Sequence, residues 1–230
     1  MPSAFPALEA ALDAVVFDFD GVILESVDVN SAAFRALFAD HPAQIDAIMD
    51  LHERHGGISR YVKFETIYRD ILRQPLASAH KEELGRRFEH LVIERVMASP
   101  MVAGALKLLE GLLGRVAMAV VSGTPDAELE TIVARRGLAP YFVEVHGGSR
   151  EKRAIIDGMM RARRWRPERM IMLGDAMTDH DAALANRIAF IGRVAKRKTD
   201  PFPPGTTTIA DLRGFAGAAA QAMALRAAAE

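Results

Sequence analysis

Two aspartates separated by a single residue could do chemistry in this chain. Asp18 and Asp20 follow the apolar run Ala14–Phe17, and Gly21 then lets the backbone turn at once. Where the pleat of a strand persists, these two side chains leave on the same side. Carboxylates at the carboxyl end of a buried strand, where open α/β sheets place their ligands, indicate metal or phosphate chemistry. Because aspartate after a strand is also an ordinary turn former, a structural role stays open.

A serine, a glycine and a threonine follow a second apolar run, residues 116–121. Here we expect Thr124 to be the N-cap of a helix and Pro125 its first residue, with Ser122 and Gly123 just before it. A hydroxyl, free backbone N–H groups and the positive end of a helix dipole would then form a phosphate cradle. An ordinary capped turn is the alternative.

A second pair of carboxylates follows the apolar run 170–173. Asp175 and Asp179 lie four residues apart, which places them on one face of a helix that begins there. The sequence therefore predicts two pairs of carboxylates at the ends of two buried strands.

Short apolar runs that alternate with helical periodicity predict the sheet that positions these residues. This alternation is typical of an α/β protein with a parallel sheet. Within the helix expected at 102–113, Leu106, Leu109 and Leu113 are predicted to share one face. The expected strands are 14–17, 116–121, 141–145, 170–173 and 188–192.

Helical periodicity dominates residues 25–99 and predicts a small inserted domain of about four helices. Segment 55–63 departs from the amphipathic pattern. A loop followed by Ser59 as the N-cap of the next helix explains it in structural terms. Its glycines, among them Gly57, together with the hydroxyl, Arg60 and Lys63 would also suit an anion, so both interpretations stay open.

Composition narrows the possible partners and compartments. The chain has 230 residues, half of them hydrophobic, and a formal net charge of -1, so no overall field favours nucleic acid or an anionic membrane. It has no cysteine, which excludes disulfides and thiol catalysis. With no apolar run long enough to span a membrane and no targeting signal at its start, the sequence predicts a cytoplasmic protein.

Four motifs occur in order, each after an apolar run: DxDG at 18–21, SGT at 122–124, Lys152, and GDxxxD at 174–179. Together they resemble the haloacid dehalogenase superfamily, in particular its phosphatases and phosphomutases with a helical cap after the first strand. The likeness covers nearly the whole chain. It implies a Rossmann-like α/β core at 1–23 and 101–230, and an inserted α-helical cap domain at 24–100.

The resemblance also implies a role for each carboxylate. Asp18 would be the nucleophile that forms an aspartyl-phosphate, and Asp20 the general acid and base. A Mg²⁺ ion would be bound by Asp18, by the backbone carbonyl of Asp20 and by Asp175, with Asp179 supporting it indirectly or through water.

The substrate implied by the resemblance is a small phosphorylated metabolite. Ser122, Gly123 and Thr124 would hold its phosphoryl oxygens, and Lys152 would offset the crowding of negative charge. A sugar phosphate or a phosphorylated acid such as phosphoglycolate would fit, and the protein would act as a monomer or homodimer.

The loop with Gly57, Ser59 and Arg60 resembles the specificity loop of β-phosphoglucomutases and related sugar phosphatases. By this likeness Arg60, with Lys63, would grip the distal end of the substrate while the cap closes and excludes water.

Three functions remain open, and a phosphatase leads. Retention of Asp20 favours phosphoryl transfer over dehalogenation, because the true dehalogenases lack an acid there. A phosphomutase would use the same residues, but Glu25 stands where relatives usually have aspartate, and Asn30 where mutases and many phosphatases have histidine. A non-catalytic binding protein would not require the nucleophile and the acid together.

Overall fold

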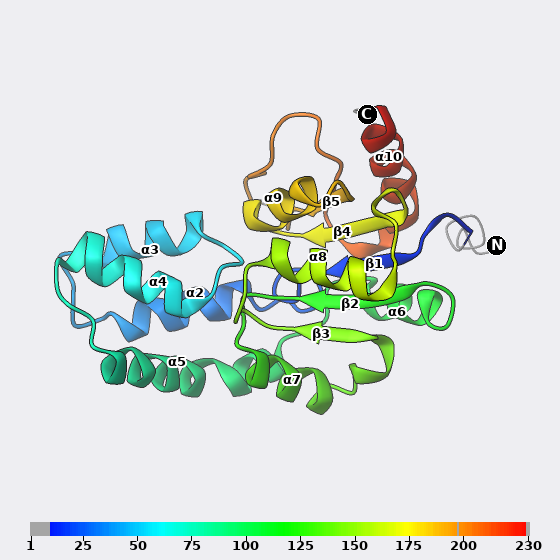
Figure 1. The fold of residues 1–230 in the computed structure, drawn as a ribbon. Helices are drawn as coiled ribbons and strands as arrows, with labels where there is room; N and C mark the ends of the chain where they lie inside the picture. The colour runs from blue at the N-terminus through cyan, green and yellow to red at the C-terminus, as the bar shows by residue number, and fades with distance from the viewer. Residues whose placement is uncertain (1–9, 197, 229–230) are drawn as a thin grey trace.

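The computed structural model describes residues 10–196 and 198–228, so residues 1–9 of the expected core lie outside the described part of the chain. Within that part, a parallel sheet of six strands has the order β3-β2-β1-β4-β5-β6 (Figure 1). The expected α/β fold is confirmed. The strands are β1 (Ala14–Phe17), β2 (Ala117–Val121), β3 (Glu144–His146), β4 (Met170–Gly174), β5 (Ala189–Arg193) and β6 (Thr208–Ile209).

The central strand β1 is buried on both faces, because its side chains alternate between two helical layers. Val15 and Phe17 pack into the larger core with one layer, and Ala14 and Val16 pack into a second core with the other. The first layer comprises α6 (Ala105–Leu112), α7 (Asp126–Arg135) and α10 (Phe215–Ala228). The second comprises α8 (Lys152–Arg163) and α9 (Met177–Ala185).

Strand register brings the functional segments to one edge of the sheet. Phe17, the last residue of β1, pairs with Val120 of β2 on one side and with Leu173 of β4 on the other. The chain therefore leaves these three neighbouring strands at the same level. The DxDG, SGT and GDxxxD segments begin side by side as a result.

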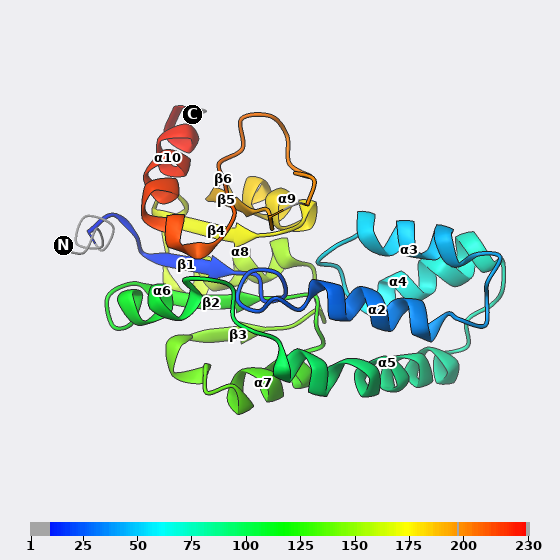
Figure 2. The same cartoon turned by 180° about the vertical axis from the view of Figure 1, so that it is seen from behind.

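Beyond this edge lies a helical insert, which Figures 1 and 2 show as a separate layer at one end of the sheet. Its core is aromatic: the Phe34 ring lies 5.0 Å from the Phe88 ring and 5.7 Å from the Phe64 ring. The expectation of about four helices agrees with the four α-helices and one π-helical turn observed between β1 and Pro100. These are α2 (Val27–Leu37), α3 (Ile45–Arg54), α4 (Arg60–Thr66), the turn Ile67–Leu72 and α5 (Ser78–Ala98).

The third strand lies further along the chain than the sequence predicted. The expected strand 141–145 is wrong in its first half, because Ala139–Tyr141 forms a 3₁₀ turn and β3 begins at Glu144. Pro140 near the start of this turn has a fixed φ that suits it. Phe142 then packs edge-on against Phe17, with 6.3 Å between ring centroids.

The basic run 161–169 has several of its charges paired on the protein itself. Arg166 and Arg169 both donate to Asp13, and Arg163 donates to Glu144.

None of the helices in residues 10–196 and 198–228 combines the length and the apolar character that a membrane crossing requires.

Helix α6 buries one of the three leucines of the predicted stripe, Leu109, and leaves the other two exposed. Leu106 and Leu113 are 44% and 46% exposed, whereas Leu108 and Leu109 are buried. The prediction was wrong for Leu106 and Leu113 because the helix packs into the core and against the 3₁₀ turn Leu212–Gly214, and the spacing of the leucines does not say which face meets them.

The observed burial of α6 predicts that Leu108→Ala and Leu106→Ala lower the free energy of unfolding by different amounts. Leu108→Ala is expected to lower the free energy of unfolding by about 2–5 kcal/mol, because Leu108 is 2% exposed and its removal leaves a cavity. The matched control Leu106→Ala is expected to change it by less than about 0.5 kcal/mol. Urea unfolding of both variants tests this, and an equal loss in the two would contradict the observed face.

Candidate active site

A buried ammonium joins two aspartates at the carboxyl edge of the sheet. Lys152, the first residue of α8, donates from Nζ to Asp18 Oδ1 at 2.7 Å and to Asp179 Oδ1 at 2.6 Å. All three side chains are at most 7% exposed. Burial disfavours the charge on Lys152, but the carboxylates of Asp179 and Asp18 outweigh burial and raise the pKa of the ammonium.

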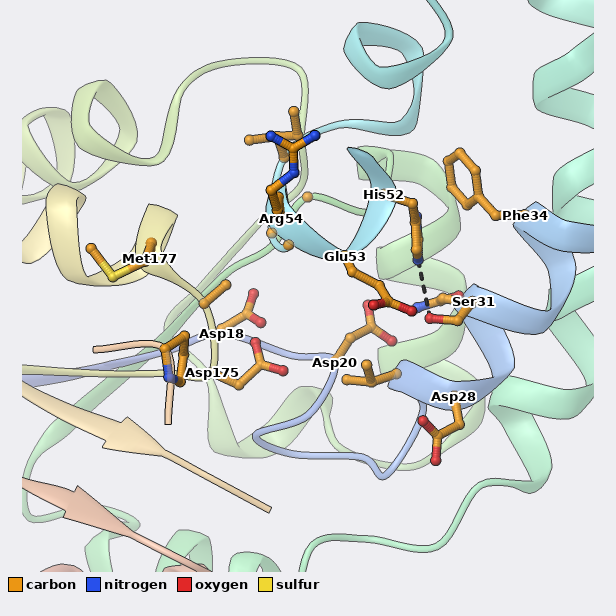
Figure 3. A pocket seen from close by; sticks show the side chains of 18 of the residues that line it. Asp18, Asp20, Asp28, Ser31, Phe34, His52, Glu53, Arg54, Asp175 and Met177 are labelled. Atoms are coloured by element: carbon orange, nitrogen blue, oxygen red, sulfur yellow. Dashed lines mark hydrogen bonds between the residues drawn. The ribbon is translucent and has the colours of Figure 1, made fainter. Parts of the chain in front are cut away.

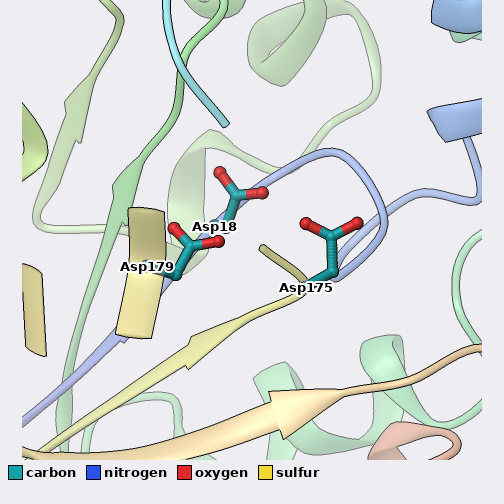
Figure 4. Close-up of side chains that lie close together, drawn as sticks. All are labelled: Asp18, Asp175 and Asp179. Atoms are coloured by element: carbon teal, nitrogen blue, oxygen red, sulfur yellow. The ribbon is translucent and has the colours of Figure 1, made fainter. Parts of the chain in front are cut away.

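Asp175 completes a cluster of three carboxylates (Figure 4). Oxygens of Asp18, Asp175 and Asp179 lie within 4.8 Å of one another. Burial raises the pKa of Asp175, and the negative charges of Asp18 and Asp179 raise it further. Burial likewise raises the pKa of Asp18, although Lys152 opposes the shift. One ammonium thus faces three carboxylates, and oxygen ligands of this kind with surplus negative charge fit a hard divalent cation such as Mg²⁺.

The Asp20 carboxylate is turned away from this cluster and held by two hydroxyls. Ser26 Oγ donates a short hydrogen bond to Asp20 Oδ1, and Thr124 Oγ1 donates to Asp20 Oδ2 at 3.0 Å. Thr124 comes from the loop after β2 and Ser26 from the start of α2. Hydroxyls from two segments that are far apart in the sequence therefore fix the orientation of Asp20.

The SGT loop does not cap its helix in the predicted way. Pro125 is the N-cap, with φ −53° and ψ 143°, and α7 begins at Asp126. Thr124 is therefore not the N-cap, and its hydroxyl is engaged by Asp20 instead. Ser122 Oγ accepts a hydrogen bond from Thr124 N at 3.1 Å, which folds the loop tightly around Gly123.

The loop before α4 touches the core directly. Thr178 Oγ1 of α9 donates to the Gly56 carbonyl at 2.8 Å. Gly57 has φ +74°, and a Cβ there would lie 2.4 Å from Thr178 Oγ1 and 3.2 Å from Lys152 Nζ. A Cβ on Gly123 would lie 2.6 Å from the Gly57 carbonyl oxygen. The absence of a side chain at Gly57 and Gly123 allows the insert and the core to approach this closely.

Two cations of the insert lie in different electrostatic surroundings. Arg60 donates to Glu128 of α7 at 2.8 Å, in a buried ion pair between insert and core, and its guanidinium lies 4.3 Å from the Phe88 ring centroid. Lys63 donates to the backbone carbonyl of His52 at 3.1 Å. Burial lowers the pKa of Lys63 to about 8. Arg60 is neutralised by its partner, and Lys63 is the cation without a carboxylate at hydrogen-bonding distance.

A pocket of about 810 Å³ lies between the core and the insert and is lined by residues of both (Figure 3). Asp18, Asp20 and Asp175 lie on one side in Figure 3, and His52 and Ser31 face them from the other. Gly57, Arg60, Lys63, Ser122, Gly123 and Thr124 also line the pocket. Ser59 lies outside its lining; it is the N-cap of α4 by position, but its side chain makes no capping hydrogen bond.

Comparison with known proteins identifies the family. The model of the family described as haloacid dehalogenase-like hydrolase matches residues 15–193, which is more than half of the chain. The chain belongs to the haloacid dehalogenase-like hydrolases. The expected enzyme class, a hydrolase, is thereby confirmed.

Similar proteins include one curated enzyme and many solved structures. A phosphoglycolate phosphatase of Synechococcus elongatus is 25% identical over 175 residues, which cover 75% of this chain and 79% of that protein. A mutant of CbbY from Rhodobacter sphaeroides, solved with xylulose-1,5-bisphosphate, has a TM-score of 0.69 at 17% identity and covers 87% of this chain and 94% of its own. A magnesium-bound putative hydrolase, YfnB of Bacillus subtilis, has a TM-score of 0.66 at 16% identity, covering 89% and 96%. At such identities the structures show the shared fold.

In this haloacid dehalogenase-like hydrolase, the sequence did not identify His52, which lines the pocket, nor Glu128 and Thr178, which bind residues of the insert. His52 carried a weak signal, since it continues the apolar stripe of Ile45, Ile48 and Met49 on α3 as its one polar member. Glu128 and Thr178 carried none, because only tertiary structure brings them to Arg60 and Gly56.

Gly57→Ala is expected to loosen the loop between α3 and α4 from the core. The new Cβ would displace the Thr178 hydroxyl from Gly56 and add the strain of a left-handed alanine, about 1–2 kcal/mol. Gly114→Ala is a matched control, because Gly114 has φ +73° and nothing lies within 4 Å of its Cβ position. Hydrogen exchange of residues 55–58 should rise in Gly57→Ala alone; unchanged exchange would contradict the close contact.

Asp175→Asn is expected to stabilise the metal-free protein. The pKa of Asp175 is raised in the folded state, so its contribution to stability is greatest below the ordinary value of 3.8 and is lost as the pH rises through its folded pKa. The variant should gain about 1–2 kcal/mol at neutral pH, and the gain should vanish in acid. Thermal unfolding in a chelator measures it, with Asp181→Asn as an exposed control on α9. If Asp175→Asn were less stable than the wild type at neutral pH, the clustered carboxylates would not be destabilising the metal-free protein.

Proposed function

We propose that this hydrolase is a magnesium-dependent phosphatase that acts on a small phosphorylated metabolite through an aspartyl-phosphate on Asp18. The observation that carries the proposal is the arrangement of Asp18, Asp20, Asp175 and Lys152, which we call the floor of the pocket. There a buried aspartate is held by Lys152, and a second aspartate two residues later is held apart by hydroxyls. The likeness to a phosphoglycolate phosphatase supports a phosphorylated acid or a sugar phosphate as the substrate.

In the proposed reaction, Asp18 is the nucleophile and Asp20 is the general acid and base. An oxygen of Asp18 attacks phosphorus and a P–O bond to Asp18 forms as the ester P–O bond breaks, while Asp20 gives a proton to the leaving oxygen. Asp20 then takes a proton from water as the water attacks phosphorus. The P–O bond to Asp18 breaks, and inorganic phosphate and the free carboxylate are restored. Lys152, the Ser122 hydroxyl and the Gly123 backbone N–H stabilise the charge on the phosphoryl oxygens.

The carboxylate cluster supports the proposed metal. Asp18 and Asp175, with the backbone carbonyl of Asp20, would hold Mg²⁺, and Asp179 would support them through its bonds to Lys152 and to the backbone N of Ala176. When bound, the ion offsets the repulsion between the nucleophile and the phosphoryl group.

We further propose that the helical insert, residues 24–100, is a cap domain over a core at 1–23 and 101–230. Its contribution to substrate binding would come from Lys63, whose charge no carboxylate neutralises at hydrogen-bonding distance. Arg60 would keep the cap on the core through Glu128, with Gly57 and Ser59 shaping the loop. The cytoplasmic location and the monomeric or homodimeric state stay predictions from the sequence.

Phosphate release from a panel of phosphorylated metabolites, with and without Mg²⁺, tests the proposal. Release should depend on the metal, and Asp18→Asn should lower kcat by at least about 10³-fold, because the nucleophile is lost while the shape is kept. Asp181→Asn, with an exposed side chain, serves as the matched control and should retain activity.

Two other outcomes would overturn the phosphatase. Conversion of a sugar phosphate only in the presence of a bisphosphate activator, with little release, would identify the phosphomutase that the sequence left open. Binding of phosphorylated ligands without turnover of any kind would identify a binding protein.

A further inference from the structure

A histidine that the proposed reaction does not use lies in the wall of the pocket formed by the insert. His52 of α3 is 7% exposed, and Lys63 beside it is 5% exposed. The imidazole stacks at a tilt against Phe34, with 4.1 Å between ring centroids. A buried polar ring fixed in this way needs partners for both of its nitrogens.

Both nitrogens have partners, and these partners decide which nitrogen carries the proton. Lys63 Nζ lies 3.3 Å from His52 Nδ1. Ser31 Oγ lies 3.2 Å from Nε2 on the other side of the ring, and Figure 3 marks this contact with a dashed line. An ammonium only donates, so Nδ1 must accept and the ring proton must lie on Nε2, which donates to Ser31. Burial and the charge of Lys63 lower the pKa of His52 to about 3, which agrees with a neutral ring.

The same contacts account for most of the bonding capacity of the ammonium. Lys63 has three N–H groups, of which one reaches the His52 carbonyl at 3.1 Å and a second reaches Nδ1. The Phe34 ring lies on a further side, with 5.4 Å between its centroid and Nζ. Lys63, His52 and Ser31 all line the pocket, so the remaining N–H is available to a molecule within it.

We propose that His52 is a positioning residue for substrate recognition: through its Nδ1 and carbonyl it orients Lys63 so that the third N–H meets an anionic group at the distal end of the substrate. This inference rests on the proposed phosphatase function and adds to it the residue that directs the recognising charge. Ser31 fixes the tautomer that makes the orientation possible.

Three substitutions separate this role from simple packing. His52→Asn retains an amide group near the position of Nδ1, His52→Gln places its amide near the position of Nε2, and His52→Leu keeps bulk without any acceptor. Packing alone would favour the larger side chains, whereas positioning requires an acceptor near Nδ1. Thermal unfolding identifies variants that fail to fold.

The kinetic test compares two phosphate esters, 2-phosphoglycolate and ethyl phosphate, which differ in the distal carboxylate. The wild type should prefer the carboxylate, and His52→Leu should raise KM for 2-phosphoglycolate by roughly tenfold, as expected when a hydrogen bond to a charged group is lost. Its kcat and its activity on ethyl phosphate should stay unchanged. His52→Asn should restore most of the preference and His52→Gln should not.

A second measurement needs no turnover. Long-range ¹H–¹⁵N spectra of the histidine rings, with His52 assigned from His52→Asn, should show a neutral ring protonated at Nε2. In Lys63→Met the ring should become easier to protonate, because the neighbouring cation is gone.

The outcomes distinguish the two levels of the proposal. A ring protonated at Nδ1, or an equal effect of His52→Leu on both esters, would overturn the role of His52 while leaving the phosphatase intact. A wild type that hydrolyses phosphate esters without preference for the carboxylate would overturn recognition by Lys63. Hydrolysis of neither ester nor of any panel member would overturn the proposed function itself and, with it, the substrate role of His52.

Discussion

Carboxylates taken out of water repel one another and favour protonation, and the floor of this pocket depends on how Lys152 offsets that cost. Its ammonium lies between Asp18 from β1 and Asp179 from α9, so one ion-pair network joins two segments that are far apart in the sequence. Asp175 shares the cluster but lacks an equivalent bond to Lys152. The compensation is therefore incomplete, and the surplus negative charge suits the cation of the proposed mechanism.

The insert contacts the core beside the Lys152 network and at two ion pairs around the pocket. A Cβ on Gly57 would lie 3.2 Å from Lys152 Nζ, so the loop before α4 lies directly beside the buried ammonium. The Arg60–Glu128 pair, at 2.8 Å, and the Lys198–Asp28 pair, at 3.0 Å, connect the two parts elsewhere around the pocket. The first pair is buried, so loss of either partner would leave an uncompensated charge out of water, whereas the second pair is exposed and solvent screens it.

Much of the floor could be predicted from the sequence, because its chemistry lies within short segments that directly follow buried strands. Asp18, Asp20 and Asp175 each come at the end of such a run, and parallel strands bring these ends together. The face of α6 was not predictable, since leucines occupy several sides of that helix and only packing selects one. The partners of Arg60 and Lys63 lie on other elements, and no local pattern encodes a contact such as Arg60 with Glu128, 68 positions away.

Glu25, which follows the first motif, has a clear structural partner in Arg193. Glu25 accepts two hydrogen bonds from Arg193 at the end of β5, at 3.0 and 2.6 Å, and Arg193 also donates to the Gly21 carbonyl at 3.1 Å. One arginine thus ties the turn after Asp20 to the segment that leads into the insert. A glutamate side chain is one methylene longer than that of aspartate, and this reach suits a bidentate pair with the guanidinium of Arg193 at the end of β5. The linker is therefore anchored to the end of β5, while Lys63 on the insert side of the pocket has no carboxylate at hydrogen-bonding distance and is the cation proposed to contact the substrate.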